Sequence, residues 1–336
     1  MGGFGNIDLD ELVLTGDGLS LRAWRLDGAG TGLECAIAAD ATAVGRASLQ
    51  LSADDPAEGG IEITVDPAAR RRGYATQAVR LLAGFAFGHG VRRVRIGCGV
   101  GEVAWARTAL AAGFGFEGVR RGTTGPAGGP DGRQDRAEFA RLDTDPDVRQ
   151  RPAFAPLPGG GLEDGVIRLR PTGPEDTDAF VEQEQDALTV RNGFAGTAPP
   201  PARVAAMTRG AALEWVVGPA APMTIVDVAS GRFAGAVRLR KPGPPGVGSI
   251  GYVVHPAFRG RGYATRALRL IVAWAFDAGF ARLELGVKID NPASLRVAER
   301  AGFVREGVRA ARLLSPDGTY VDEVSFALTA SATRSP

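Results

Sequence analysis

The chain contains the stretch Val254-His255-Pro256-Ala257-Phe258-Arg259-Gly260-Arg261-Gly262-Tyr263-Ala264-Thr265, and an earlier copy reads Val65-Asp66-Pro67-Ala68-Ala69-Arg70-Arg71-Arg72-Gly73-Tyr74-Ala75-Thr76. In each copy a strand-like run ends in a proline turn, and a basic, glycine-containing loop then opens into a helix. The first N–H groups of such a helix have no partner inside the helix, and they point toward one spot together with the positive end of the helix dipole. This arrangement suits a pyrophosphate. The sequence therefore predicts two phosphate-binding loops.

The repeat extends well beyond the loop. A shift of 189 positions aligns residues 73–120 with residues 262–309 without a gap, and 22 of these 48 positions are identical. The matched stretch predicts a loop, a helix, a strand, and a second helix that ends in Ala-Gly-Phe. Solenoid units repeat over much shorter distances, so a repeat of this length indicates a duplicated domain.

The two halves differ before the loop. In the first half, predicted strands at 19–24 and 33–39 are separated by only eight residues, which leaves no room for two helices. The second half predicts helices at 176–184 and 202–216 after its first strand. Its predicted strands are 166–171, 223–228, 233–240, 249–254 and 283–287, and the helix after the loop is 264–276.

Residues 144–165 carry four prolines and the run Gly159-Gly160-Gly161, a composition that favours an irregular linker. We therefore expect a first domain at 1–143, a linker at 144–165 and a second domain at 166–330. A chain of 336 residues is long enough for two such domains, each with its own core.

The composition excludes several classes of partner. A net charge of +1 provides no general attraction for nucleic acid or anionic membranes, and no aromatic and basic platform is present. Residues 1–12 do not resemble a signal peptide, and no apolar run is long enough to span a membrane. We expect a soluble cytoplasmic protein without a nucleic-acid or membrane partner. The sequence favours neither a monomer nor a dimer.

The chain has two cysteines, Cys35 and Cys98, both in apolar strand-like surroundings. Two cysteines make no disulfide framework, so we expect free buried thiols in a reducing compartment. No cluster of His, Cys and acidic residues has the spacing of metal ligands, so no metal is expected.

From residue 166 onward, a series of motifs points to one family of enzymes. In chain order they are Leu169-Arg170-Pro171, Asp176, Ile250-Gly251-Tyr252, Arg259-x-x-Gly262-x-Ala264, Asn291-x-x-Ser294, Glu299-x-Ala301-Gly302-Phe303, Glu306-Gly307, and Asp322 before the last strand. Together they resemble the GNAT superfamily of acetyl-CoA-dependent N-acetyltransferases in a tandem arrangement. The second half is similar to the RimJ/RimL-like branch, which acetylates ribosomal-protein N-termini, whereas the first half resembles the family well only over residues 59–142.

This resemblance implies an α+β fold with two tandem GNAT domains. Each would be a mixed, mostly antiparallel twisted sheet flanked by helices and splayed between its fourth and fifth strands. Acetyl-CoA would lie in that opening, between 249–254 and 283–287, with pantetheine along the backbone of Val253 and Val254. Free N–H groups there would polarise the thioester carbonyl, and the amine would attack directly.

The resemblance also assigns roles to individual residues. Ser294 would protonate or hydrogen-bond the leaving thiolate, and Asn291 would contact pantetheine or cap the helix. The residues expected to hold acetyl-CoA through the loop are Arg259, Gly260, Arg261, Gly262, Tyr263 and Ala264, with Arg72, Gly73, Tyr74 and Ala75 as their counterparts in the first half. Structural alternatives are a simple N-cap for Asn291, surface charge for Arg259 and Arg261, packing for Tyr263 and Tyr74, a turn for His255 and a hairpin anchor for Asp322.

The general base is not evident. An amine with a pKa of about 8 to 10 must lose a proton before it attacks. Relatives often use a Glu on the fourth strand or after the Ala-Gly-Phe helix, and those places hold Ser249 and Arg312-Leu313-Leu314 here. The remaining candidates are Glu182, Glu184, Asp186 and Glu323, or a chain of water molecules.

At the positions of Asn291 and Ser294 the first half has Glu102 and Trp105. Tryptophan cannot donate to a thiolate as a hydroxyl does, and its bulk would fill the space near the thiol. We therefore expect a degenerate, structural first domain that lacks the acceptor-side helices, and a catalytic second domain.

The expected reaction is acetylation of the α-amine of a protein or peptide, including a peptide natural product. Residues 186–200, including Phe194, are predicted to line the acceptor cleft. One alternative is a small amine or antibiotic acceptor. Another is a non-catalytic acyl-CoA-binding module, which the missing base favours and which Ser294 with Asn291 argues against.

Overall fold

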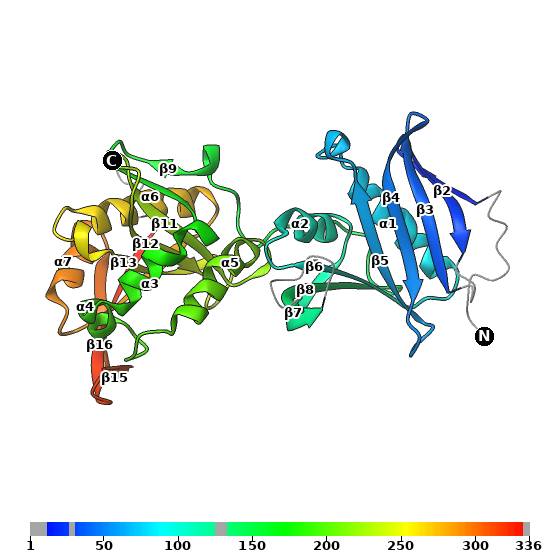
Figure 1. The fold of residues 1–336 in the computed structure, drawn as a ribbon. Helices are drawn as coiled ribbons and strands as arrows, with labels where there is room; N and C mark the ends of the chain where they lie inside the picture. Colours follow the sequence, from blue (N-terminus) through cyan, green and yellow to red (C-terminus); the bar gives the residue numbers. More distant parts are fainter. Residues whose placement is uncertain (1–11, 27–30, 125–132, 332–336) are drawn as a thin grey trace. The chain divides into compact units, whose positions relative to one another are not determined.

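The structure is a computed structural model that describes residues 12–26, 31–124 and 133–331. The chain divides into two compact units, residues 1–152 and residues 153–336, and each contains one eight-stranded mixed sheet with helices packed on it (Figure 1). The predicted α+β fold with two tandem domains is confirmed.

The second unit has the sheet order β9-β10-β11-β12-β13-β14-β16-β15. Its strands are β9 (Leu162–Glu163), β10 (Ile167–Pro171), β11 (Ala220–Asp227), β12 (Phe233–Arg240), β13 (Val247–Val254), β14 (Arg282–Lys288), β15 (Val304–Leu314) and β16 (Tyr320–Thr329). Its helices are η2 (Pro158–Gly160), η3 (Pro174–Asp176), α3 (Thr177–Gln185), α4 (Ala187–Asn192), α5 (Pro201–Val217), η4 (Pro256–Phe258), α6 (Tyr263–Asp277) and α7 (Pro292–Arg300).

The first unit repeats this topology with the order β1-β2-β3-β4-β5-β6-β8-β7. Its elements are β1 (Val13–Gly16), β2 (Leu19–Leu26), β3 (Gly32–Ala39), β4 (Thr42–Leu51), β5 (Glu58–Val65), η1 (Pro67–Ala69), α1 (Tyr74–Gly88), β6 (Arg93–Gly99), α2 (Val103–Ala111), β7 (Gly115–Thr124) and β8 (Arg133–Leu142). The segment between β2 and β3 is far too short for helices such as α3 and α5.

One pair of strands in each sheet is parallel: β5 with β6, and β13 with β14. A parallel pair needs a crossover connection, and α6 supplies it in the second unit. The helix is amphipathic, with Ala267, Leu268 and Ile271 completely buried at helical spacing against Leu283 and its neighbours in the core. Burial of this stripe fixes α6, and with it the loop at its start, against the sheet.

The parallel pairing is short, and the sheet therefore splays. Register pairs join β13 to β14 only from Val247↔Arg282 to Ser249↔Glu284, although β13 continues to Val254 and β14 to Lys288. We call the resulting opening the V, with β13 and β14 as its arms. It lies between the predicted strands 249–254 and 283–287, as expected, although the short β9 makes β13 and β14 the fifth and sixth strands of the unit rather than the fourth and fifth.

A glycine is required next to the V in the second unit, and another is required next to the equivalent strands of the first unit. The backbone of β12 at Gly235 lies so close to the carbonyl oxygen of Val253 that a Cβ would collide with it, and Gly45 of β4 is in the same position against Thr64. A larger residue at either place would push the central strands apart.

The segment predicted as a linker is partly built into the second unit. Phe154 and Leu157 are buried in its core, where the ring of Phe154 lies 6.2 Å from that of Trp215, and β9 pairs with β10. The prolines and glycines of this segment prevent long regular structure but not packing. The core of the second unit therefore begins about ten residues before its first predicted strand.

The structure also shows the surroundings of Asp322 and of the two cysteines. Asp322 lies within β16 rather than before it, and its carboxylate accepts a hydrogen bond from the N–H of Ala311 across the hairpin (2.9 Å), which confirms the hairpin anchor. Cys35 and Cys98 are buried and free, as expected. Among the described residues, no helix is long and apolar enough to cross a membrane, and no group of metal-ligating side chains occurs.

Candidate active site

The loop before α6 presents its backbone as predicted. Gly260 and Gly262 have φ values of +76° and +79°, a left-handed conformation that glycine adopts without strain, and both are exposed. The first turn of α6 has no side-chain cap, and the first N–H bonded into the helix is that of Arg266, to the oxygen of Gly262 (3.1 Å). The preceding amides are the orphan donors of a helix start, which fit an anionic group.

The side chains of this loop turn away from that spot. Tyr263 is buried, and its hydroxyl donates to Asp227 at the end of β11. The guanidinium of Arg261 lies over the ring of Phe258, 5.1 Å from its centre. Arg259 reaches α4 instead. The loop therefore offers mainly its backbone to a ligand, and the packing interpretation of the Tyr263 ring is confirmed.

His255 is a structural turn residue, as expected. It is buried, its Nδ1 accepts from the N–H of Ala257 (3.4 Å), and its Nε2 lies 3.5 Å from the exposed carboxylate of Glu182.

The register of β13 decides which backbone groups face the V. The N–H of His255 donates to Ala234 of β12 (2.9 Å), and successive residues of a strand direct their backbone groups to alternate sides. Val253 therefore also bonds toward β12, whereas Tyr252 and Val254 face the V. The backbone groups of Val253 are thus directed toward β12 and not into the V as predicted, whereas those of Tyr252 and Val254 are directed into it.

Ser294 and Tyr252 join the two sides of the V. The hydroxyl of Tyr252 on β13 lies 2.6 Å from Oγ of Ser294, in the first turn of the helix that follows β14. Burial raises the pKa of Tyr252 to about 12, so the phenol keeps its proton. If the phenol donates to Ser294, the proton of Ser294 is left to donate elsewhere. In that arrangement, and not in the reverse one, the hydroxyl of Ser294 can act as a donor to another group.

Asn291 is the N-cap of α7. Its Oδ1 accepts from the N–H of Ser294 (3.1 Å), which satisfies one orphan donor and fixes the turn that carries the serine. The cap interpretation is confirmed. Sequence reasoning named Asn291 and Ser294 but did not give Tyr252 a role, although its place in Ile250-Gly251-Tyr252 beside the loop was a usable signal.

The first unit keeps the loop and loses the hydroxyls. Arg71 and Gly73 are left-handed, with φ of +62° and +84°, like Gly260 and Gly262. The positions equivalent to Tyr252 and Ser294 are Ile63 and Trp105. Neither of these side chains can donate a proton to a thiolate.

Two of the four candidate bases are held in ion pairs. Arg259 and the N–H of Thr189 hydrogen-bond Asp186, and these contacts lower the pKa of its carboxyl. Glu323 is buried and lies 3.2 Å from Arg309. A carboxylate stabilised in its charged form is a poor base. Glu182, in turn, is largely exposed and contacts only His255 among the described residues.

Glu184 has different surroundings. It lies in the last turn of α3, where burial raises the pKa of its carboxyl despite the nearby charge of Arg238 on β12. Arg238 has its own partner at 3.7 Å, Glu214 of α5, and pairs in register with Gly251 of β13. Glu184 is therefore a carboxylate of raised basicity beside β12, the strand that pairs with β13.

Asp176 positions this helix. Its buried carboxylate accepts from Arg170 of β10 (2.6 Å) and from the hydroxyl of Thr224 on β11 (2.7 Å). These bonds fix the start of α3 against the sheet. At the other end of α3, Gln183 is completely buried beside Glu184.

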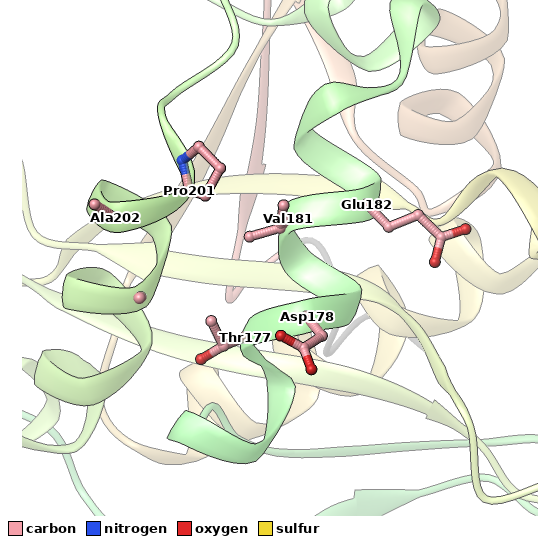
Figure 2. A pocket seen from close by; sticks show the side chains of 7 residues that line it. Thr177, Asp178, Val181, Glu182, Pro201 and Ala202 are labelled. Carbon is pink, nitrogen blue, oxygen red and sulfur yellow. The ribbon is translucent and has the colours of Figure 1, made fainter.

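A shallow hollow of about 580 Å³ lies between α3 and α5 (Figure 2). It is lined by Thr177, Asp178, Val181, Glu182, Pro201, Ala202 and Ala205. Figure 2 shows Val181 directed toward the start of α5, whereas the carboxylate of Glu182 extends away from it. No residue of β13 or β14 lines this hollow, so it is separate from the V.

Comparison with known proteins agrees with this geometry. The family model described as acetyltransferase (GNAT) domain matches residues 14–115 and 167–304, more than half of the chain. The probable N-acetyltransferase YjcK of Bacillus subtilis (strain 168) is 39% identical over 80 residues, which cover 24% of this chain and 44% of that protein. The match thus spans less than half the length of that relative.

Solved structures with a similar fold each correspond to about half of the chain. RimJ of Mycobacterium smegmatis, in complex with CoA-disulfide, is 25% identical, covers 52% of this chain and 88% of its own, and has a TM-score of 0.46. The spermidine N-acetyltransferase of Vibrio cholerae, in complex with CoA and spermine, is 16% identical, with 50% and 98% covered and a TM-score of 0.46.

Proposed function

Because this chain belongs to the GNAT family of acetyltransferases, whose domain model matches both of its halves, we propose that it transfers the acetyl group of acetyl-CoA directly to a primary amine. The proposed acceptor is the α-amine at the N-terminus of a protein or peptide, including a peptide natural product, in the cytoplasm. The observation that carries the proposal is the open V, which the hydroxyl pair of Tyr252 and Ser294 spans.

The residues beside the V fit acetyl-CoA. The amides that begin α6, with the left-handed Gly260 and Gly262, suit the diphosphate, and the backbone of Tyr252 and Val254 suits pantetheine as an added strand. Bound there, acetyl-CoA supplies an activated acyl group on a thiol that leaves readily.

Three side chains then have distinct tasks. Glu184, with its raised pKa, accepts the proton that the acceptor amine must lose. Ser294 donates a hydrogen bond or proton to the sulfur as negative charge develops on it. Tyr252 is a positioning residue that keeps the proton of Ser294 directed toward the sulfur.

Two observations favour a peptide acceptor. The motifs of the second half resemble the RimJ/RimL-like branch, and the segment between α3 and α5 exposes the apolar side chains of Leu188 and Phe194, 45% and 56% accessible. Exposed apolar groups beside a reaction site suit contact with the side chains of a peptide.

We assign the chemistry to the second unit. The first unit would be a degenerate structural copy, since Ile63 and Trp105 replace the hydroxyl pair and the five residues between β2 and β3 are too few for counterparts of α3 and α5. Its loop keeps the backbone conformation that suits a diphosphate, so binding of acetyl-CoA without turnover is proposed for this unit.

The test is thiol release from acetyl-CoA by the full chain with a panel of peptides bearing free N-termini, peptides with blocked N-termini, and small amines that include polyamines and aminoglycosides. Free peptides should be the best acceptors, and blocked peptides should give no reaction. Turnover with small amines alone would show that the acceptor is a small amine and not a peptide. If calorimetry detects binding of coenzyme A but no acceptor is acetylated, the protein is a binding module and not an enzyme.

A further inference from the structure

Helix α4 is too short to be stable by itself. It has six residues, none of them buried, and helices of this length are unstable unless other parts of the protein hold them. Its stability must therefore come from contacts at its ends. Those contacts come from both arms of the V.

The N-terminal end is held from the β13 side. Asp186, the N-cap, accepts from the guanidinium of Arg259 (2.5 Å) and from the N–H of Thr189 (2.9 Å). The same guanidinium donates to Oγ1 of Thr189 (2.9 Å), and its Nε donates to the carbonyl of Val254, the last residue of β13 (3.3 Å). Arg259 thus joins the end of one arm, the phosphate-binding loop and the start of α4.

The C-terminal end is held from the β14 side. Lys288, the last residue of β14, is 1% exposed, and its ammonium donates to the carbonyl of Arg191 (2.8 Å). The side chain of Arg191 in turn lies 3.6 Å from Asp290. An ammonium at the C-terminal end of a helix and a carboxylate at its N-terminal end both match the helix dipole.

We propose that residues 186–192 form a strap across the open end of the V, held by the positioning residues Arg259 and Lys288, and that the strap makes the acceptor-side wall dependent on cofactor binding. The inference rests on the proposed acetyl-CoA site. A ligand that fixes the loop fixes the backbone of Arg259, and through its guanidinium fixes the start of the strap. Binding of coenzyme A then orders the surface on which the acceptor is recognised.

The first unit lacks residues that hold the strap in the second unit, and this difference supports the assignment. Arg70 makes the equivalent bond from Nε to the carbonyl of Val65 (3.1 Å), but only five residues separate β2 from β3, fewer than the six residues of α4. The position of Lys288 is occupied by Gly99. The unit without a strap has thus lost the residue that holds the second end of the strap.

Hydrogen exchange of the full chain, read by mass spectrometry with and without coenzyme A, tests the proposal. In the wild type, coenzyme A should slow exchange across 186–193. Asp186→Asn keeps an N-cap but loses the ion pair, so exchange there should be about tenfold faster, the loss of one charge-assisted hydrogen bond, and coenzyme A should no longer protect it. Because coupling between two equilibria is reciprocal, the variant should also bind coenzyme A more weakly, by about the factor by which coenzyme A slows exchange over 186–193 in the wild type.

Lys288→Met should release the other end and speed exchange over the same residues. Lys241→Met is the matched control, since Lys241 contacts Ala153 and not α4. With a peptide that the wild type acetylates, both strap variants should raise the KM of the peptide at saturating acetyl-CoA, whereas Lys241→Met should leave it unchanged. Wild-type exchange over 186–193 in both variants would overturn the strap. Failure of the wild type to bind coenzyme A would overturn the proposed function instead, and exchange without ligand would still test whether the two residues hold α4.

Discussion

The hydroxyl pair across the V allows a quantitative test through Ser294→Ala. The substitution removes the donor proposed for the leaving thiolate but keeps the N–H that Asn291 caps, so α7 should remain folded. A hydrogen bond to a charged group is worth ~1.5–3 kcal/mol. At 1.36 kcal/mol per factor of ten, kcat should fall about 10- to 150-fold.

Tyr252→Phe should have a smaller effect by the same reasoning. It removes a neutral hydroxyl 2.6 Å from Oγ of Ser294, and a neutral hydrogen bond is worth ~0.5–1.5 kcal/mol, so the expected loss in kcat is about 2- to 12-fold. Because Tyr252 acts through Ser294, the double variant should be no slower than Ser294→Ala alone.

The assay is the initial rate of thiol release at saturating acetyl-CoA, with the coenzyme A Kd measured separately by calorimetry. The Kd should stay nearly constant while kcat falls. Trp105→Ala, at the equivalent place in the first unit, is the control and should leave the rate unchanged. Losses that multiply in the double variant would refute a positioning role for Tyr252, and a wild-type rate for Ser294→Ala would refute the role of the serine.

Three further predictions follow from the same surroundings. Burial raises the pKa of the Glu184 carboxyl above its ordinary 4.5, so its basic form is lost as the pH falls through that raised pKa. The pH profile of kcat/KM should therefore decline on an acidic limb above pH 4.5, and Glu184→Gln should remove this limb. An unchanged pH profile in the variant would exclude Glu184 as the base. Asn291→Ala should cost ~0.5–2 kcal/mol in urea unfolding, whereas Asn291→Asp, which still caps, should cost much less, and equal losses would contradict the cap. Burial raises the pKa of Cys35 to about 12 and that of Cys98 to about 11, so neither thiol should react with Ellman's reagent at pH 8 until the protein is denatured, and rapid labelling of the native chain would contradict their burial.

The sequence predicted those parts of the fold that depend on local pattern. The proline turn, glycines and apolar helix stripe repeat in both halves, so both phosphate-binding loops and the strands beside them were expected. Family membership and the splayed sheets confirm the predicted GNAT architecture.

The parts that were missed depend on distant residues. Helix α4 has no apolar stripe of its own, and its end contacts come from Arg259 and Lys288, 73 and 97 positions away from their partners. The hydrogen bond of Tyr252 spans 42 positions. Burial of Phe154 was hidden because proline-rich composition describes backbone regularity and not packing. The comparison of the four acidic residues likewise required their burial and their charged neighbours, which the sequence does not show.

The absence of buried side chains in α4 has an evolutionary consequence. Substitutions along its outer surface would cost the core nothing, provided that Asp186 and the carbonyl at its far end remain in reach of their partners. The region that we propose to contact the acceptor amine is thereby free to diversify while the proposed acetyl-CoA site stays constant. Exchanging residues 186–192 between related proteins should therefore change the acceptor preference while the rest of the domain stays the same.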